Sequence, residues 1–204
     1  MKVRNRTLPM LALLAAAGTL LFVTSCAKPP REATGRLDTP DHHVLRGNDA
    51  IDNNDWATAE REFNLALSLD KEYGPAISGK AVVTAQKSTD PALKAADREK
   101  RADEAVDLAK DGIKRAKNDN EKRGAYVARI RVAQIAKYPA KDWYDDAEDA
   151  YKAAVKLDDR KVDPDPDFFM ARAARDAYKM QRSQDLYRKV LSMNRGRTQQ
   201  ADSE

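Results

Sequence analysis

Two twelve-residue stretches of this chain, 59–70 and 147–158, carry the same residue pattern, and this internal repeat constrains the fold more than any other feature. Each stretch follows an Asp-Trp pair, starts at an alanine, has an aromatic residue four positions later and an alanine three further on, and ends in Leu-Asp. These spacings place the small and aromatic residues on one face of an α-helix. Because small residues allow close approach of another helix, the pattern predicts helices that pack repeatedly against their neighbours.

The sequence beyond Pro40 favours helices throughout. Alternating runs of β-branched and aromatic residues are missing, whereas Ala, Leu, Lys, Arg and Glu recur at helical spacing, which predicts an all-α domain. Turn-forming residues divide residues 41–194 into about eight helices. Asp90-Pro91 indicates one helix start, with Asp as the cap and Pro at the first helical position.

The repeated pattern resembles the second helix of a tetratricopeptide repeat (TPR). Gly47 stands twelve residues before Ala59, where the first helix of that family needs a small residue. Weaker copies begin at Ala105 and Ser183, so the four starts are 46, 42 and 36 residues apart, longer than the family period of about 34. The resemblance implies a short, irregular TPR-like array of helical hairpins with about four units. The alternative is a helical bundle without repeats.

The first residues have the layout of a bacterial lipoprotein signal peptide. A basic start with Lys2, Arg4 and Arg6 precedes an apolar run over 11–23, which is shorter than the roughly twenty residues of a membrane-spanning helix. The run ends in Val23-Thr24-Ser25-Cys26, which resembles the lipobox, whose cysteine is lipidated after cleavage. We therefore predict a signal peptide over 1–25 and a lipid on Cys26; an ordinary secretory signal is the alternative.

The segments on either side of the helical region are expected to lack fixed structure. Residues 26–40 contain three prolines, a glycine and few apolar side chains, which predicts a flexible tether behind the lipid. The polar residues 195–204 are interpreted as a disordered tail. Ala27 stands where lipoproteins kept in the inner membrane typically carry Asp, so the resemblance implies the outer membrane, facing the periplasm, over the inner membrane.

The charge balance argues against a nucleic-acid partner. The chain has 37 basic and 33 acidic residues, but three basic residues lie in the signal peptide, so the mature chain holds 34 basic residues and is nearly neutral. Nucleic-acid binding proteins need a net basic face.

No set of residues in the sequence predicts catalysis, a metal site or a cofactor. His42 and His43 are adjacent, and helical neighbours point about 100° apart, so they cannot share one metal and are expected to be exposed or capping. No nucleophile can be matched to a base, and the protein is not expected to be an enzyme.

Two acidic clusters are interpreted as structural. Residues 163–167 imitate a calcium loop, but Phe168 and Ala174 occupy the positions of its turn glycine and its bidentate glutamate. An acidic linker that ends in a helix cap at Asp167 fits better. The second cluster falls in a helix start, where carboxylates are favourable: Asp145, Asp146, Glu148 and Asp149.

The TPR resemblance implies a concave surface formed by the first helix of each unit, where such arrays bind peptides or proteins. The family geometry points seven residues toward this groove: Val44, Asn48, Ile51, Asp52, Ser78, Val82 and Gln86. The family's carboxylate clamp needs a lysine where Val44 stands, so capture of a terminal carboxylate is not expected. The sequence thus favours a membrane-anchored interaction scaffold that holds an envelope protein or peptide. A structural envelope spacer and a carboxylate-based cell-wall hydrolase are the alternatives.

Overall fold

The computed structural model describes residues 38–158, 163–193 and 197–203. The predicted signal peptide, the lipidation site Cys26 and the tether up to residue 37 lie outside the described residues. The predictions made for them therefore stay predictions.

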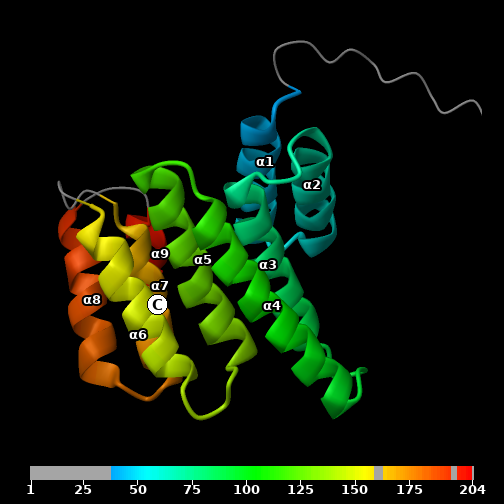
Figure 1. The fold of residues 1–204 in the computed structure, drawn as a ribbon. Helices are drawn as coiled ribbons and strands as arrows, with labels where there is room; N and C mark the ends of the chain where they lie inside the picture. Colours follow the sequence, from blue (N-terminus) through cyan, green and yellow to red (C-terminus); the bar gives the residue numbers. More distant parts are fainter. Residues whose placement is uncertain (1–37, 159–162, 194–196, 204) are drawn as a thin grey trace, which may run out of the picture. The chain divides into compact units, whose positions relative to one another are not determined.

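The described part of the chain is all α-helical and contains no strand, as predicted (Figure 1). Within the described residues, eight helices precede a short ninth one. In chain order they are α1 (Pro40–Asp52), α2 (Trp56–Leu69), α3 (Gly74–Ser88), α4 (Ala95–Arg115), α5 (Asp119–Ala136), α6 (Trp143–Lys156), α7 (Asp165–Asp176), α8 (Met180–Met193) and α9 (Thr198–Ser203). None of these helices has both the length and the apolar character that a membrane crossing requires.

The eight longer helices pack as four adjacent pairs, α1 with α2, α3 with α4, α5 with α6 and α7 with α8 (Figure 1). The first helices of the pairs also contact one another in succession, α1 with α3, α3 with α5 and α5 with α7. The second helix of each of the first three pairs contacts the first helix of the next pair. The first helices therefore form one continuous layer, and the second helices pack on it.

Local capping explains several of the helix starts. The carboxylate of Asp55 accepts a hydrogen bond from the backbone N–H of Thr58 at 3.0 Å, so the first Asp-Trp pair marks the start of α2. The second pair also lies at a helix start, with Asp142 preceding α6. Asn118 caps α5 through the backbone N–H of Glu121 at 2.9 Å. These contacts satisfy N–H groups that have no partner within the helix.

The predicted helix start at Asp90-Pro91 is wrong, because α4 begins at Ala95. The Asp90 carboxylate accepts instead from the backbone N–H of Ala92, two residues ahead, at 2.8 Å. A contact at this spacing closes a tight turn rather than a helix.

Phe63 lies on the face of α2 that the repeat pattern predicts to be packed, between the helices of its own pair and the first helix of the next pair. Its ring is fully buried, and it packs on the backbone of α1 at Gly47 and of α3 at Gly79. A Cβ at Gly47 would stand 2.6 Å from the ring, and one at Gly79 would be closer still. Both glycines are therefore required by the space that the ring fills.

The core consists of two clusters of buried apolar side chains. One surrounds Phe63 and extends from α1 to α5; the other surrounds Tyr151, Phe168 and Phe169 and extends from α5 to α9. Tyr151, the repeat partner of Phe63, is 9% exposed, and its hydroxyl donates to Asp167 at 2.7 Å. Helix α5 contributes to both clusters, so it joins the two halves of the described domain.

The C-terminal tail differs from the disorder expected for 195–204. Residues 198–203 form α9, which contacts α8, and Ala201 is 5% exposed within the second core cluster. Arg197, just before this helix, is held by two ion pairs. The polar composition of this segment predicts disorder, because one buried alanine and one ion-paired arginine cannot be recognised from the sequence.

Candidate partner-binding groove

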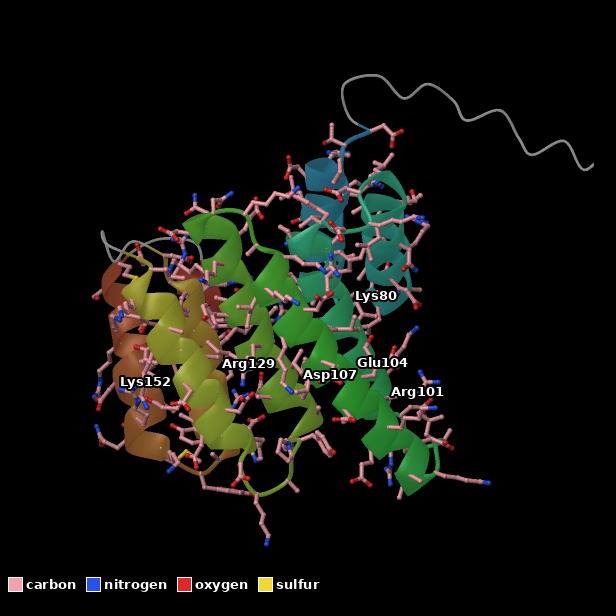
Figure 2. The ribbon with its side chains drawn as sticks, in the orientation of Figure 1. Lys80, Arg101, Glu104, Asp107, Arg129 and Lys152 are labelled. Atoms are coloured by element: carbon pink, nitrogen blue, oxygen red, sulfur yellow. The ribbon has the colours of Figure 1, made fainter. Side chains whose placement is uncertain are left out.

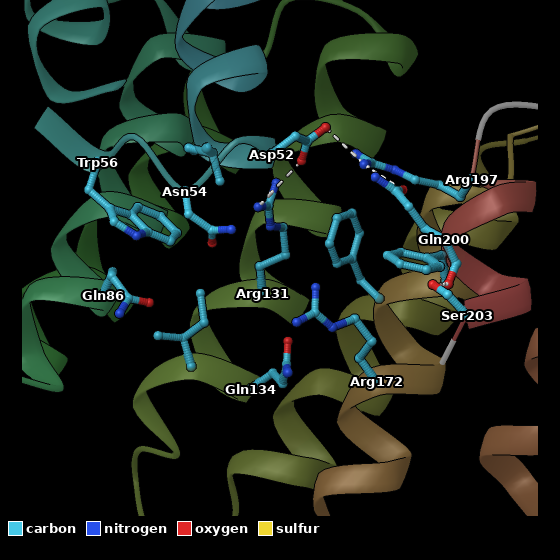
Figure 3. Close-up of a pocket in the computed structure, with 14 residues that line it drawn as sticks. Asp52, Asn54, Trp56, Gln86, Arg131, Gln134, Arg172, Arg197, Gln200 and Ser203 are labelled. Atoms are coloured by element: carbon cyan, nitrogen blue, oxygen red, sulfur yellow. Dashed lines mark hydrogen bonds and ion pairs between the residues drawn. The ribbon is translucent and has the colours of Figure 1, made fainter. Parts of the chain in front are cut away.

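The layer of first helices lines two adjoining pockets, which together form a groove. The pocket at the N-terminal ends of α1, α3 and α5 is here called the apolar pocket, because Val44, Ile51, Val82 and Val127 line it. The pocket toward their C-terminal ends is called the arginine pocket, after Arg131, Arg172 and Arg197 (Figure 3). Four residues line both pockets: Ile51, Arg131, Phe169 and Arg197.

The structure brings all seven residues predicted for the groove together on this surface. Val44, Asn48, Ile51, Ser78 and Val82 line the apolar pocket, and Ile51, Asp52 and Gln86 line the arginine pocket. Their depths differ: Ile51, Ser78 and Val82 are buried and form the floor, whereas Asn48 and Asp52 are exposed. That a partner binds them stays a prediction.

Equivalent positions of the four first helices face the groove. Asn48 of α1, Val82 of α3, Ala128 of α5 and Phe169 of α7 all line the apolar pocket. Val44, Ser78, Gly124 and Asp165, each four residues earlier, line the same pocket. The first step, from α1 to α3, is 34 residues, and the later steps are longer.

The contributions of α5, α7 and the C-terminal segment were missed by the sequence analysis. The predicted units were aligned on their second helices, but α4 begins only after the six-residue connection 89–94 and is 21 residues long. The number of residues between the groove-facing positions of α3 and the repeat pattern in α4 therefore differs from that in the first pair. Counting from the first-helix positions, with the longer steps allowed, would have pointed to Arg131 and Arg172, which stand where Ile51 stands in α1.

The arginine pocket gathers three guanidinium groups beside two aromatic rings (Figure 3). The Arg131 guanidinium lies 4.4 Å from the ring centre of Phe169, and the Arg172 guanidinium 6.0 Å from that of Phe168. Arg197 lies near both rings, at 5.1 and 5.6 Å. Cations over ring faces are attracted by the negative charge of the π system, so the rings hold the guanidinium groups toward the pocket.

The charge environments of two of these arginines differ. Burial lowers the pKa of Arg131 to about 10 despite the carboxylate of Asp52 nearby. Burial also acts to lower the pKa of Arg197, but the carboxylates of Asp165 and Asp52 outweigh it and raise that pKa. Arg197 is therefore a satisfied cation, whereas Arg131 lacks comparable compensation.

Arg197 joins the two ends of the helical array. Its Nη1 lies 2.8 Å from Oδ2 of Asp52 at the end of α1, and its Nε lies 2.8 Å from Oδ1 of Asp165 at the start of α7. The first of these pairs connects residues 145 positions apart in the chain. The segment before α9 thus forms one edge of the groove.

His43 lies in a buried polar cluster, contrary to the exposed or capping position expected for it. Its Nδ1 is 2.8 Å from Oε2 of Glu62, which is 2% exposed, and its Nε2 is 3.0 Å from Oδ1 of Asp38. Arg61 also donates to Glu62 at 2.9 Å. Because both ring nitrogens face carboxylates, the cluster favours the doubly protonated imidazolium, which has no lone pair for a metal or a substrate proton.

The acidic cluster 163–167 is divided among separate ion pairs. Asp163 pairs with Arg123 at 2.7 Å, Asp165 with Arg197, and Asp167 with Lys189 at 2.7 Å. Asp167 also accepts a hydrogen bond from the Tyr151 hydroxyl. The predicted helix cap at Asp167 is wrong, because Asp167 lies within the first turn of α7. Within the described residues, no three His, Cys, Asp or Glu side chains are grouped as metal ligands would be.

The acidic residues at the start of α6 serve similar contacts between helices. Asp146 pairs with Arg129 of α5, and Glu148 with Arg182 of α8 at 3.0 Å. Other charged side chains stand on the outer helices, such as Glu104 and Asp107, which are exposed on α4 (Figure 2). The outer surface is thus charged and solvated, and the groove is where apolar and cationic side chains meet.

Comparison with known proteins gives no relative from which a function can be transferred. The sequence matches no known family model, and a search of curated proteins also gave no match. The functional argument for this chain therefore depends on its own groove.

Proposed function

We propose that this protein is a membrane-anchored interaction scaffold of the bacterial cell envelope, which holds an extended segment of a protein partner in the groove of a TPR-like array. The observation that supports this most is the register of the four first helices. Asn48, Val82, Ala128 and Phe169 occupy equivalent places along one continuous surface. Repeat arrays use such surfaces, lined by successive first helices, to bind peptides.

The anchor in this proposal is the lipid on Cys26, with the outer membrane as the site and the periplasm as the compartment. The lipobox-like residues Val23-Thr24-Ser25-Cys26 support it. Labelled palmitate is expected to enter the parent protein and not the Cys26→Ser variant, because serine offers no thiolate for the lipid transfer. Equal labelling of the two proteins would contradict the anchor without affecting the groove.

The groove is tested by site-specific photo-crosslinking in living cells. A photoreactive residue at Asn48, exposed in the groove, is expected to give a discrete adduct with an envelope protein. The same residue at Asn64, equally an exposed asparagine but on α2 and outside both pockets, serves as the matched control. An adduct from position 64 alone would place the partner on the outer layer.

The same experiment tests the spacer, and replacement of acidic residues tests the hydrolase. A purely structural spacer gives no adduct from either position. A carboxylate-based hydrolase would lose cell-wall turnover when acidic residues are replaced, and Asp146 and Glu148 are the pair to replace first, although both already serve ion pairs with arginines.

A further inference from the structure

Arg131 is a largely buried cation that has no hydrogen bond to the side chain or backbone of another described residue. Its side chain is 14% exposed, and its one ion pair among the described residues is a 4.0 Å contact with Oδ1 of Asp52. The Asp52 carboxylate already accepts from Arg197 at 2.8 Å. A guanidinium carries N–H donors on every nitrogen, and donors that reach a pocket can bind a ligand there. In this structure no hydrogen bond connects those of Arg131 to another described residue, and the side chain lines the arginine pocket.

The charges around the groove are unequal at its two ends. Three arginines and one acidic residue, Asp52, line the arginine pocket. The apolar pocket has the opposite balance, because the acidic residues Glu121, Asp163 and Asp165 line it beside the two shared arginines. An anionic group is therefore attracted to the arginine end in preference to the other.

We infer that the arginine pocket binds the aspartate or glutamate side chains of an acidic segment in the protein partner. This rests on the proposed function and adds the chemistry of the partner. Arg131 supplies the donors, since a guanidinium matches a carboxylate with two parallel hydrogen bonds, and Arg172 adds a second positive charge to the same pocket. Asp52 and Asp165 keep Arg197 in place at the edge of the pocket.

The neighbouring pocket defines the rest of the bound segment. Val44, Ile51 and Val82 present an apolar surface that is continuous with the arginine pocket through Ile51 and Phe169. A partner with an acidic residue a few positions from an aliphatic one can fill both pockets at once. Selection among acidic partners then comes from the apolar side chain, while the carboxylate fixes the direction of the segment.

The test is selection of short random peptides displayed on phage, with the full-length protein in detergent as bait. The C-terminus of each peptide is fused to the coat protein, so that a free terminal carboxylate is absent. Selected peptides are expected to be enriched in aspartate and glutamate next to aliphatic residues. A synthetic copy of a selected peptide should bind Arg131→Met and Arg172→Met about tenfold or more weakly, as expected when a charge-assisted hydrogen bond is lost.

Arg188→Met is the matched control, because Arg188 is an exposed arginine of α8 that lines neither pocket. Circular dichroism of each variant shows whether it is folded, and Arg172→Met supplies a second measurement should Arg131→Met not fold. Peptides selected without acidic enrichment, but blocked by a bulky residue at Asn48, would overturn the inference and leave the proposed function standing. If no peptide is selected, both fail.

A titration with inorganic phosphate distinguishes a free anion from a peptide. The inference expects phosphate to compete only weakly, since it cannot occupy the apolar pocket. The contrary outcome is that phosphate binds the parent protein as tightly as the selected peptide does, and loses the same affinity in both arginine variants. That result would assign the pocket to a small anion and overturn the inference that it binds a peptide.

Discussion

At the scale of single residues, the contact between Phe63 and two glycines gives a sharp prediction. Replacing glycine by alanine inside a helix normally stabilises it by about 1 kcal/mol. At Gly79, however, the new Cβ would overlap the Phe63 ring, and overpacking of a core costs about 1 to 3 kcal/mol. We therefore expect Gly79→Ala to lower the midpoint of thermal unfolding.

Gly124 provides the control for this prediction. It is also a helical glycine, in α5, but a Cβ there would meet nothing within 4 Å. Gly124→Ala should increase the free energy of unfolding by roughly 0.5 to 1 kcal/mol. The unfolding midpoint should therefore rise. If both variants shift the midpoint in the same direction, the packing around Phe63 does not govern the outcome.

The His43 cluster predicts how stability depends on pH. Burial by itself lowers the pKa of His43, but its hydrogen bonds to Glu62 and Asp38 outweigh burial and raise the pKa above 6.5. Burial likewise acts to raise the pKa of Glu62, yet the hydrogen bonds from His43 and Arg61 lower it below 4.5. A raised histidine pKa adds stability below pH 6.5 that is lost as the pH rises through the folded-state value. The lowered glutamate pKa adds stability above pH 4.5 that is lost on acidification.

The contribution of the cluster is therefore greatest between these limits. Unfolding free energy, measured by urea titration at a series of pH values, should fall as the pH rises from 6.5 through the raised pKa of His43. His43→Gln should flatten this alkaline decline, and His42→Gln should leave it unchanged. A decline that persists in His43→Gln would assign it to other groups.

At the scale of elements, the repeat pattern predicted more than composition did. The Asp-Trp pairs that precede both stretches lie at helix starts, and the alanine and aromatic spacing predicted the packed faces of α2 and α6. These features are local, since capping and face periodicity depend on a few consecutive residues. The inner faces of α5 and α7 depend on connection lengths that a short motif does not encode, so Arg131 and Arg172 were missed. His43 was missed because its partner Glu62 is 19 residues away.

Helix α9 provides the prediction at this scale. Its buried contact is Ala201, whereas Gln200 on the same helix is exposed. Ala201→Glu places a charge among apolar side chains, which is costly without a partner, and should release α9 from α8. Hydrogen exchange of peptides covering 197–203 should then accelerate, while Gln200→Glu leaves it unchanged. Equal acceleration in both variants would mean that the burial of Ala201 does not hold the helix.

At the scale of the whole described domain, the question is whether the two core clusters unfold together. Phe63 lies in the cluster from α1 to α5, and Tyr151 lies in the cluster from α5 onward. Among the described residues, α5 contributes to both clusters, and Arg197 connects the C-terminal segment to Asp52 of α1. The pair of Arg197 with Asp52 is partly exposed, at 15% and 33%, and such pairs contribute up to about 1 kcal/mol.

Removing either buried ring costs more free energy of unfolding than this ion pair contributes. Replacing a buried aromatic residue by alanine costs about 3 to 5 kcal/mol, and arrays of helix pairs are coupled mainly between neighbours. Phe63→Ala should therefore accelerate hydrogen exchange first in peptides from α1 to α4, and Tyr151→Ala first in peptides from α6 to α8. Tyr151→Phe keeps the ring and removes only the hydroxyl that donates to Asp167, so it should have a smaller effect in the same half. Equal acceleration across all helices in both alanine variants would mean that the domain is a single cooperative bundle, and the repeat interpretation would then fail.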